Sequence, residues 1–140
     1  MTTKSPIVDV LITLQDALGG QYGELSRPQL RLMMKLGDVD PTVSELAERL
    51  NISSSGVTQM LDKLASRSFI TRYSPDKDQR VVRVAITDRG QDVLTLAVKQ
   101  FEQRVLEMTE TFSDPEKQLL TEFLQRMTQQ YGRKHKRTQP

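Results

Sequence analysis

Residues 42–90 read TVSELAERLNISSSGVTQMLDKLASRSFITRYSPDKDQRVVRVAITDRG, and this stretch decides the fold. It opens with Thr42 and Glu45 at the spacing of a capping box, in which each side chain bonds the other residue's backbone amide at a helix start. Apolar residues then recur at the helical positions i, i+3, i+4 and i+7. This pattern predicts a short helix over residues 42–50 with one buried face.

A second helix follows after a very short turn. Residues 51–52 are too few for anything else, and we expect Ile52 to point inward. Ser53 is a suitable cap for a helix that runs to about Arg67. Its core stripe consists of Val57, Met60, Leu61 and Leu64. Its opposite face carries Ser54, Ser55, Thr58, Gln59, Asp62 and Lys63.

The polar face of this second helix is unusual for a solvent-exposed surface. Ser and Thr are mediocre helix formers, so a merely solvated face would normally carry Glu and Lys. Small side chains let a helix N-terminus approach a phosphate, and Gln can read adenine through paired hydrogen bonds. A start rich in capping residues explains Ser53 and one neighbour, but not Thr58 and Gln59. The face therefore favours docking into the major groove of a duplex.

A β-hairpin is predicted after the helix pair. Residues 69–73 read as one strand, and residues 80–86 alternate apolar and polar side chains as a second. The intervening Pro, Asp, Lys and Asp residues have turn chemistry. Thr87 then caps a long helix. Such a basic hairpin, with a charged tip, reaches toward the phosphates or the minor groove.

Charge is distributed unevenly along the chain, although its net value is only +2. Residues 51–90 hold seven Lys or Arg against four Asp or Glu, whereas residues 91–130 hold four against seven. Charge alone leaves a solvated face and a nucleic-acid surface equally open. The position of the basic segment on the second helix and hairpin favours the nucleic-acid surface.

Composition excludes several classes of protein. The 140 residues contain no Cys, which rules out disulfides and thiolate metal sites, and the single His135 lies in a basic tail. We find no phosphate loop, no nucleophile beside a base and no metal-ligand cluster, and we expect neither an enzyme nor a cofactor or metal. The chain also lacks a signal peptide or a bilayer-length apolar run, so we expect a soluble cytoplasmic protein without membrane contact.

Two segments resemble the MarR family of winged helix-turn-helix transcription regulators. One is residues 42–59, which resembles the family's helix-turn-helix, and the other is Asp78 and Arg80 followed by an apolar strand, Thr87 and Gly90. The resemblance implies a mainly α fold with a small β-hairpin wing, flanked by dimerisation helices. It also implies that Arg80 enters the minor groove and that Asp78 helps to hold the wing. A surface ion pair at the hairpin tip is the alternative.

The chain departs from the family pattern at two positions. Ser68, at the end of the second helix, stands where the family often has Gly, so this Ser must accept a less comfortable backbone or a different cap. Gln59 stands where the family often has Arg. This second departure means that the operator sequence cannot be inferred from the resemblance.

The resulting hypothesis is a homodimeric regulator that binds a palindromic double-stranded DNA operator. We expect it to act as a repressor that is relieved by a small, often aromatic ligand. We predict dimerisation regions at residues 1–26 and 91–131, a DNA-binding region at residues 27–90 and a basic disordered tail at residues 132–140. The candidate DNA-binding residues are Thr42, Ser53, Ser54, Ser55, Thr58, Gln59, Lys63, Arg72, Lys77, Asp78 and Arg80. The alternative function is a winged-helix module for protein contacts.

The ligand site itself is not identified by the sequence. Tyr22, Met33 and Met34 lie where the resemblance places a ligand pocket between the dimer and DNA regions. A Met pair at helical spacing is more often part of a core, so both interpretations stay open.

Overall fold

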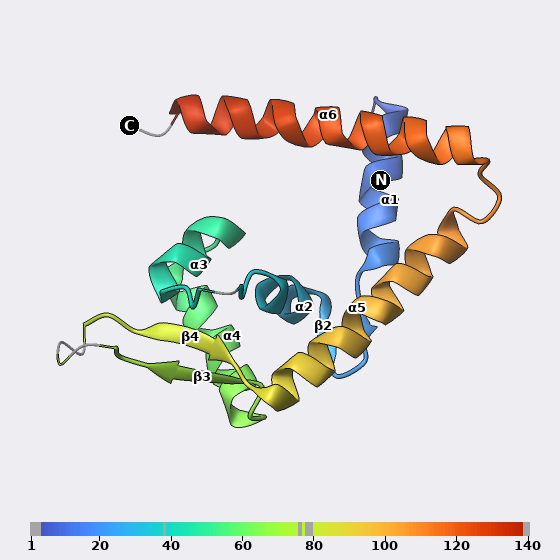
Figure 1. The fold of residues 1–140 in the computed structure, drawn as a ribbon. Coiled ribbons are helices and arrows are strands. Elements are labelled where there is room, and N and C mark those ends of the chain that lie inside the picture. The colour runs from blue at the N-terminus through green and yellow to red at the C-terminus, as the bar shows by residue number, and fades with distance from the viewer. Residues whose placement is uncertain (1–3, 38, 76, 78–79, 139–140) are drawn as a thin grey trace. The chain divides into compact units, whose positions relative to one another are not determined.

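The computed structural model describes residues 4–37, 39–75, 77 and 80–138, with side chains to residue 133. The elements, shown in Figure 1, are α1 (Pro6–Leu18), β1 (Gln21–Tyr22), β2 (Leu25–Ser26), α2 (Arg27–Met34), α3 (Val43–Leu50), α4 (Ser54–Ser66), β3 (Ile70–Tyr73), β4 (Arg83–Ile86), α5 (Asp88–Met108) and α6 (Asp114–Thr138). The predicted class, mainly helical with a small β-hairpin wing, is confirmed.

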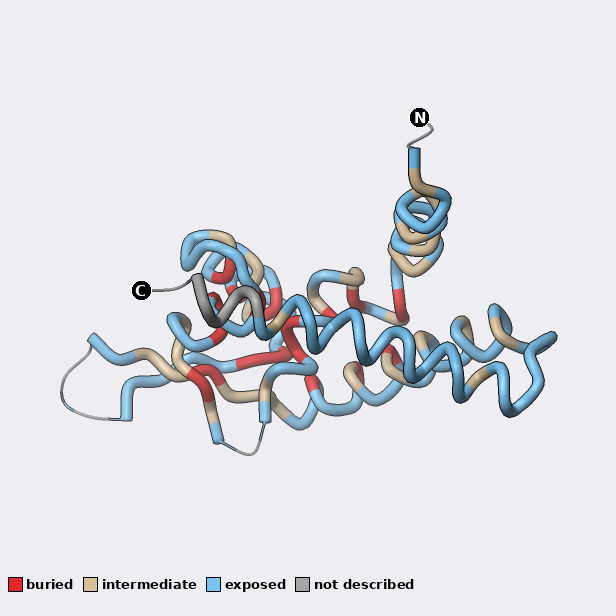
Figure 2. The backbone as a smooth tube through the Cα atoms, turned by 90° about the horizontal axis from the view of Figure 1, so that it is seen from above, coloured by how far each residue is buried: buried red, intermediate tan, exposed pale blue. Residues whose placement is uncertain are grey.

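The chain forms two compact units, Met1–Gln103 and Arg104–Pro140. In the first unit, α2, α3 and α4 lie beside the β3–β4 hairpin (Figure 1). Figure 2 shows the buried backbone concentrated in these elements and in the first half of α5. The core of this unit consists of Tyr22, Leu25, Leu30, Leu32, Met33, Leu46, Ala47, Leu50, Val57, Leu61, Leu64, Phe69, Ile70, Val84, Val93 and Ala97.

Capping explains where the two helices of the helix-turn-helix begin and end. Thr42 and Glu45 form the predicted box, with bonds of 3.1 and 3.3 Å to each other's amides. At the end of α3, Asn51 adopts a left-handed φ of 54°, and the N–H of Ile52 donates to the carbonyl of Ala47. This is a Schellman-type ending, which Asn tolerates well. Ile52 is 38% exposed, so the prediction that it points inward is wrong.

The end of α4 repeats this arrangement with a less suitable residue. Ser68 has a φ of 64°, and the N–H of Phe69 donates to the Leu64 carbonyl at 3.0 Å. A left-handed backbone brings Cβ too close to the next carbonyl oxygen, which is why Gly is usual there. The expected strain at Ser68 is therefore present in the structure.

Ser68→Gly is expected to raise the free energy of unfolding by about 0.5–1 kcal/mol, because Gly adopts this backbone without the Cβ contact. Chemical denaturation followed by circular dichroism measures the change. Asn51→Gly is the matched control, and it should change stability by only a few tenths of a kcal/mol, at most about 0.5. A loss of stability in Ser68→Gly would contradict this account.

The start of α5 packs directly against the end of α4. Thr87 caps α5, since its hydroxyl accepts the N–H of Gly90 at 2.9 Å and donates to the carbonyl of Ser68 at 2.6 Å. The N–H of Thr87 donates to the carbonyl of Phe69. A Cβ on Gly90 would lie 1.9 Å from that same Phe69 oxygen. Only glycine permits this approach.

Several features were not predicted from the sequence. Tyr22 and Leu25 pair across a two-residue turn as β1 and β2. In α2, Leu32 is buried and Met34 is exposed. Helical spacing in the sequence instead favours an apolar stripe of Leu30, Met33, Met34 and Leu36. None of the described helices is both long enough and apolar enough to cross a bilayer.

The second unit contains the end of α5 and α6. The spacing of Ser113 and Glu116 in the sequence predicts a second capping box, and the structure contains it. The hydrogen bond from the backbone N–H of Ser113 lowers the pKa of the Glu116 carboxyl. α6 continues to Thr138, through most of the stretch for which a disordered tail was predicted. Lys and Arg are good helix formers, and positive charge is favourable near a helix C-terminus.

Candidate nucleic-acid interface

The predicted reading face lies on the exposed side of α4. Ser53, Ser54, Ser55, Thr58, Gln59 and Lys63 are all exposed. Ser53 caps the helix by accepting the N–H of Gly56 at 3.1 Å, and its hydroxyl lies 3.1 Å from that of Ser55. The hydroxyl of Thr58 donates to the carbonyl of Ser54 at 2.9 Å. A hydroxyl that donates in this way still has lone pairs to accept a bond from a ligand.

Thr42 lies at the start of α3, half-buried rather than on the exposed face of α4. Its hydroxyl is used in the capping box, and its backbone pairs with Arg83. An open hollow of about 320 Å³ is lined by Thr42, Val43, Ser44, Arg80, Val81 and Val82. The hollow brings the start of α3 together with one of the two predicted wing residues.

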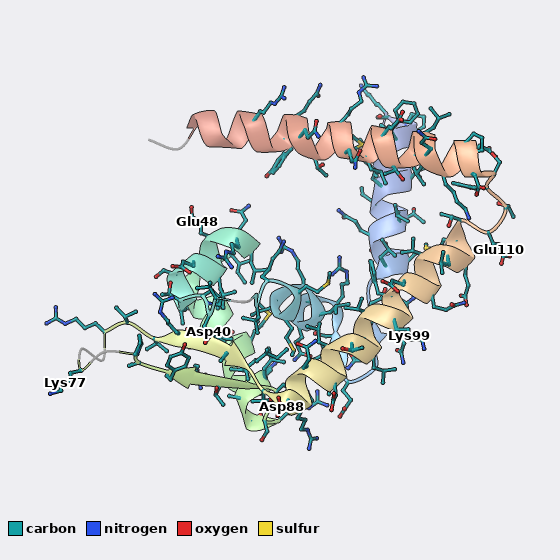
Figure 3. All side chains as sticks on the ribbon, viewed as in Figure 1. Asp40, Glu48, Lys77, Asp88, Lys99 and Glu110 are labelled. Carbon is teal, nitrogen blue, oxygen red and sulfur yellow. The ribbon has the colours of Figure 1, made fainter. Side chains whose placement is uncertain are left out.

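The hairpin is fixed to the loop that precedes α3. β4 pairs with β3 in an antiparallel register on one side, and on the other side the N–H of Val84 donates to the carbonyl of Pro41 at 2.9 Å. Arg83 donates to the Asp40 carbonyl at 2.7 Å. Asp40 is labelled in Figure 3, beside the hairpin. These bonds set the direction in which the wing projects.

A tyrosine completes this attachment. The hydroxyl of Tyr73 donates to the Asp40 carboxylate. The hydrogen bond to Asp40, more than burial or the negative charge of Asp40, raises the pKa of Tyr73, while Arg83 lowers it. The phenol therefore stays protonated as a donor across the neutral range. No local sequence pattern identifies Asp40, Tyr73 and Arg83 as partners, so their contacts were not predicted.

The wing tip carries exposed cations. Lys77 and Arg80 are exposed, and Figure 3 shows Lys77 at the free end of the hairpin. Asp78, the other predicted wing residue, lies outside the described residues. The described part of the wing is thus positively charged at its tip.

Arg72 was predicted to contact DNA, but in the structure it is paired with another side chain of the protein. Its Nη1 lies 2.6 Å from Oδ1 of Asp62, so β3 is linked to α4 by an ion pair. Arg72 also lines an open hollow of about 460 Å³. The other lining residues are Val43, Thr58, Tyr73, Ser74 and Val82. The structure thus brings Arg72 and Thr58 together between the reading helix and the wing.

Comparison with known proteins assigns the family. The model of the MarR family matches residues 25–82. The chain is 30% identical over 110 residues to the uncharacterized HTH-type transcriptional regulator YxaD of Bacillus subtilis, a match that covers 78% of this chain and 77% of YxaD. The chain belongs to the MarR family. It is also 32% identical over 104 residues to the regulator YdgJ of B. subtilis, covering 74% of this chain and 63% of YdgJ.

Solved structures agree with the MarR-family fold. A MarR protein from Peptoclostridium difficile superposes with a TM-score of 0.84 at 19% identity, covering 99% of this chain and 95% of that one. A mutant of E. coli MarR complexed with operator DNA superposes with a TM-score of 0.71 at 21% identity, covering 86% and 90%. The fold that the resemblance implied is therefore confirmed.

Proposed function

We propose that this MarR-family protein is a homodimeric, sequence-specific regulator of transcription that binds double-stranded DNA. The observation that carries the proposal is the exposed hydroxyl and amide face of α4 beside a wing that exposes Lys77 and Arg80. The E. coli MarR mutant, which shares the fold, was crystallised with operator DNA, and this supports the same use of the fold here. The match spans 63% of the length of YdgJ, so the activity of that relative is not transferred directly.

The geometry suggests how the two elements divide the contacts. α4 enters the major groove, where Ser54 and Ser55 meet phosphates at its N-terminus and Gln59 reads a base edge. Arg80 reaches from the wing into the minor groove, whose negative potential attracts guanidinium groups. Lys63 and Lys77 contribute phosphate contacts that add affinity without selecting a sequence.

Homodimer formation is proposed from apolar residues that the chain leaves uncovered. α6 has no buried residue among those described, and Figure 2 shows it mostly exposed, with Lys117 and Gly132 half-buried. Its exposed apolar residues are Leu119, Leu120, Phe123, Leu124, Met127 and Tyr131, and α1 exposes Ile7, Val8, Val10 and Ile12. An apolar surface of this kind marks a protein interface. We assign residues 1–26 and 91–131 to it, so sedimentation should give twice the 16.0 kDa chain mass.

Repression relieved by a small ligand is the proposed mode of regulation. Tyr22 and Met33 are fully packed in the core, and Met34 is exposed, which argues against the ligand position considered from the sequence. The hollow that Thr58 and Arg72 line has about 460 Å³, within the range of small-molecule sites. A ligand there lies beside the reading helix and competes with its contacts to DNA.

A gel-shift experiment on the gene's own upstream region tests DNA binding against the alternative of a protein-contact module. We expect salt-dependent binding with half-sites about one helical turn, ~10 bp, apart. Absence of salt-dependent binding to every duplex tested would favour the protein-contact module, which does not require hydroxyls and an amide on α4.

Gln59→Ala is expected to change which base is preferred at one operator position. Loss of a paired hydrogen bond to adenine reduces discrimination by about 1–3 kcal/mol. Competition binding with operator variants and random duplex measures the change. Lys63→Ala is the contrasting variant, which should weaken specific and random binding equally. An equal loss on both duplexes for Gln59→Ala would exclude base reading by this residue.

A further inference from the structure

Asp62 places a negative charge on the side of α4 that the proposed function turns toward DNA. Ser55, Gln59 and Asp62 are spaced four and three residues apart, which puts them on one face of the helix. The side chain of Asp62 is 60% exposed. A carboxylate in that position repels phosphates, and it needs a partner if the face is to approach a duplex.

The structure supplies that partner from β3. Arg72 Nη1 contacts Oδ1 of Asp62 at 2.6 Å, and the Arg72 side chain is 34% exposed. An ion pair as exposed as this contributes little to folding, so stability alone does not account for it. The pair also removes one negative and one positive charge from the reading surface at once.

We propose that Arg72 acts on DNA through Asp62, as a positioning residue that neutralises this carboxylate rather than as a phosphate contact of its own. The inference rests on the proposed function, because it concerns the same reading face. It reassigns the role that the sequence suggested for Arg72. Asp62 in turn keeps the Arg72 cation from adding affinity that is independent of sequence.

The two roles give opposite results in a double-mutant cycle. If Arg72 neutralises Asp62, Arg72→Ala exposes the carboxylate and weakens binding to specific and random duplexes by about fivefold for each half-site, the upper range for an exposed pair. Asp62→Asn then loses no affinity, and the freed Arg72 guanidinium steepens the salt slope by about 0.9 for each half-site. The double variant D62N/R72A returns to within about twofold of the native affinity, because neither charge is left.

Fluorescence anisotropy with operator and random duplexes over a salt series measures all four proteins. A double variant as weak as Arg72→Ala would overturn the proposal, because Arg72 would then touch DNA itself. Weaker binding by Asp62→Asn would also overturn it, since the pair would be only a brace between α4 and β3. Thermal melts by circular dichroism establish that each variant is folded at the assay temperature.

Glu24→Gln is the matched control. Glu24 pairs with Arg67, the C-cap residue of α4, at 3.2 Å and with similar exposure, and Arg67 also donates to the backbone carbonyl of Glu24. This variant removes the same charge and should leave the salt slope unchanged, whereas an equal steepening would show a general charge effect and contradict the inference. If the native chain shows no salt-dependent binding, the proposed function fails; if it binds and the double variant is not rescued, only this inference fails.

Discussion

Gly90→Ala should destabilise the first unit by about 3 kcal/mol, the upper range for an overpacked site. The added Cβ would lie 1.9 Å from the carbonyl oxygen of Phe69 and 2.8 Å from its carbonyl carbon. Both atoms belong to a backbone that cannot rotate aside as a flexible side chain would. Relief requires α5 to move away from the end of α4, which breaks the bonds from Thr87 to Ser68 and Phe69.

Urea unfolding followed by circular dichroism measures this loss. Gly37→Ala is a suitable control, because a Cβ there meets no atom within 4 Å. The control should stay within about 0.5 kcal/mol of the native protein. An overpacked site costs at least about 1 kcal/mol. If the free energy of unfolding of Gly90→Ala lies within about 1 kcal/mol of the native value, the close approach at Phe69 is not rigid.

Arg80→Ala is the second change with a large expected effect, and it acts on DNA binding. Hydrogen bonds from a charged donor contribute about 1.5–3 kcal/mol, so each half-site should lose at least about tenfold in affinity. A dimer bound to both half-sites then loses at least about a hundredfold, on specific and random sequences alike. The side chain is exposed on the wing, so the folded state should be unaffected.

Anisotropy titrations at fixed salt measure the affinity. Arg31→Ala, at an exposed position of α2, removes the same charge away from the wing and serves as the control. Equal losses in the two variants would mean that Arg80 contributes only net charge. In that case the minor-groove role of the wing would have to be abandoned.

Features that depend on neighbouring residues could be predicted from the sequence. The capping boxes at Thr42 and Ser113 are local patterns, and both are present. The strained backbone of Ser68 was expected from the family resemblance, because the family often has Gly at this helix end. The exposed face of α4 followed from helical periodicity in the same way.

Contacts between distant segments could not be predicted. Asp62 and Arg72 are joined only because β3 turns back along α4, and Tyr73 meets Asp40 across 33 positions of the chain. Burial in α2 was also misassigned, since Met34 is exposed and Leu32, which was left out of the expected stripe, is buried. The helical end of α6 was missed because a basic composition was taken as a sign of disorder.

The bonds between β4 and the loop before α3 have a consequence for how operator spacing evolves. Arg83 and Val84 of the wing are hydrogen-bonded to the carbonyls of Asp40 and Pro41, in the loop before α3. Lengthening or shortening that loop therefore changes the distance between α4 and the wing. The side chains on the exposed face of α4 and at the wing tip stay the same. Under the proposed function, insertions in this loop would let related regulators accept half-sites of different lengths. No substitution in α4 or in the wing tip would be needed.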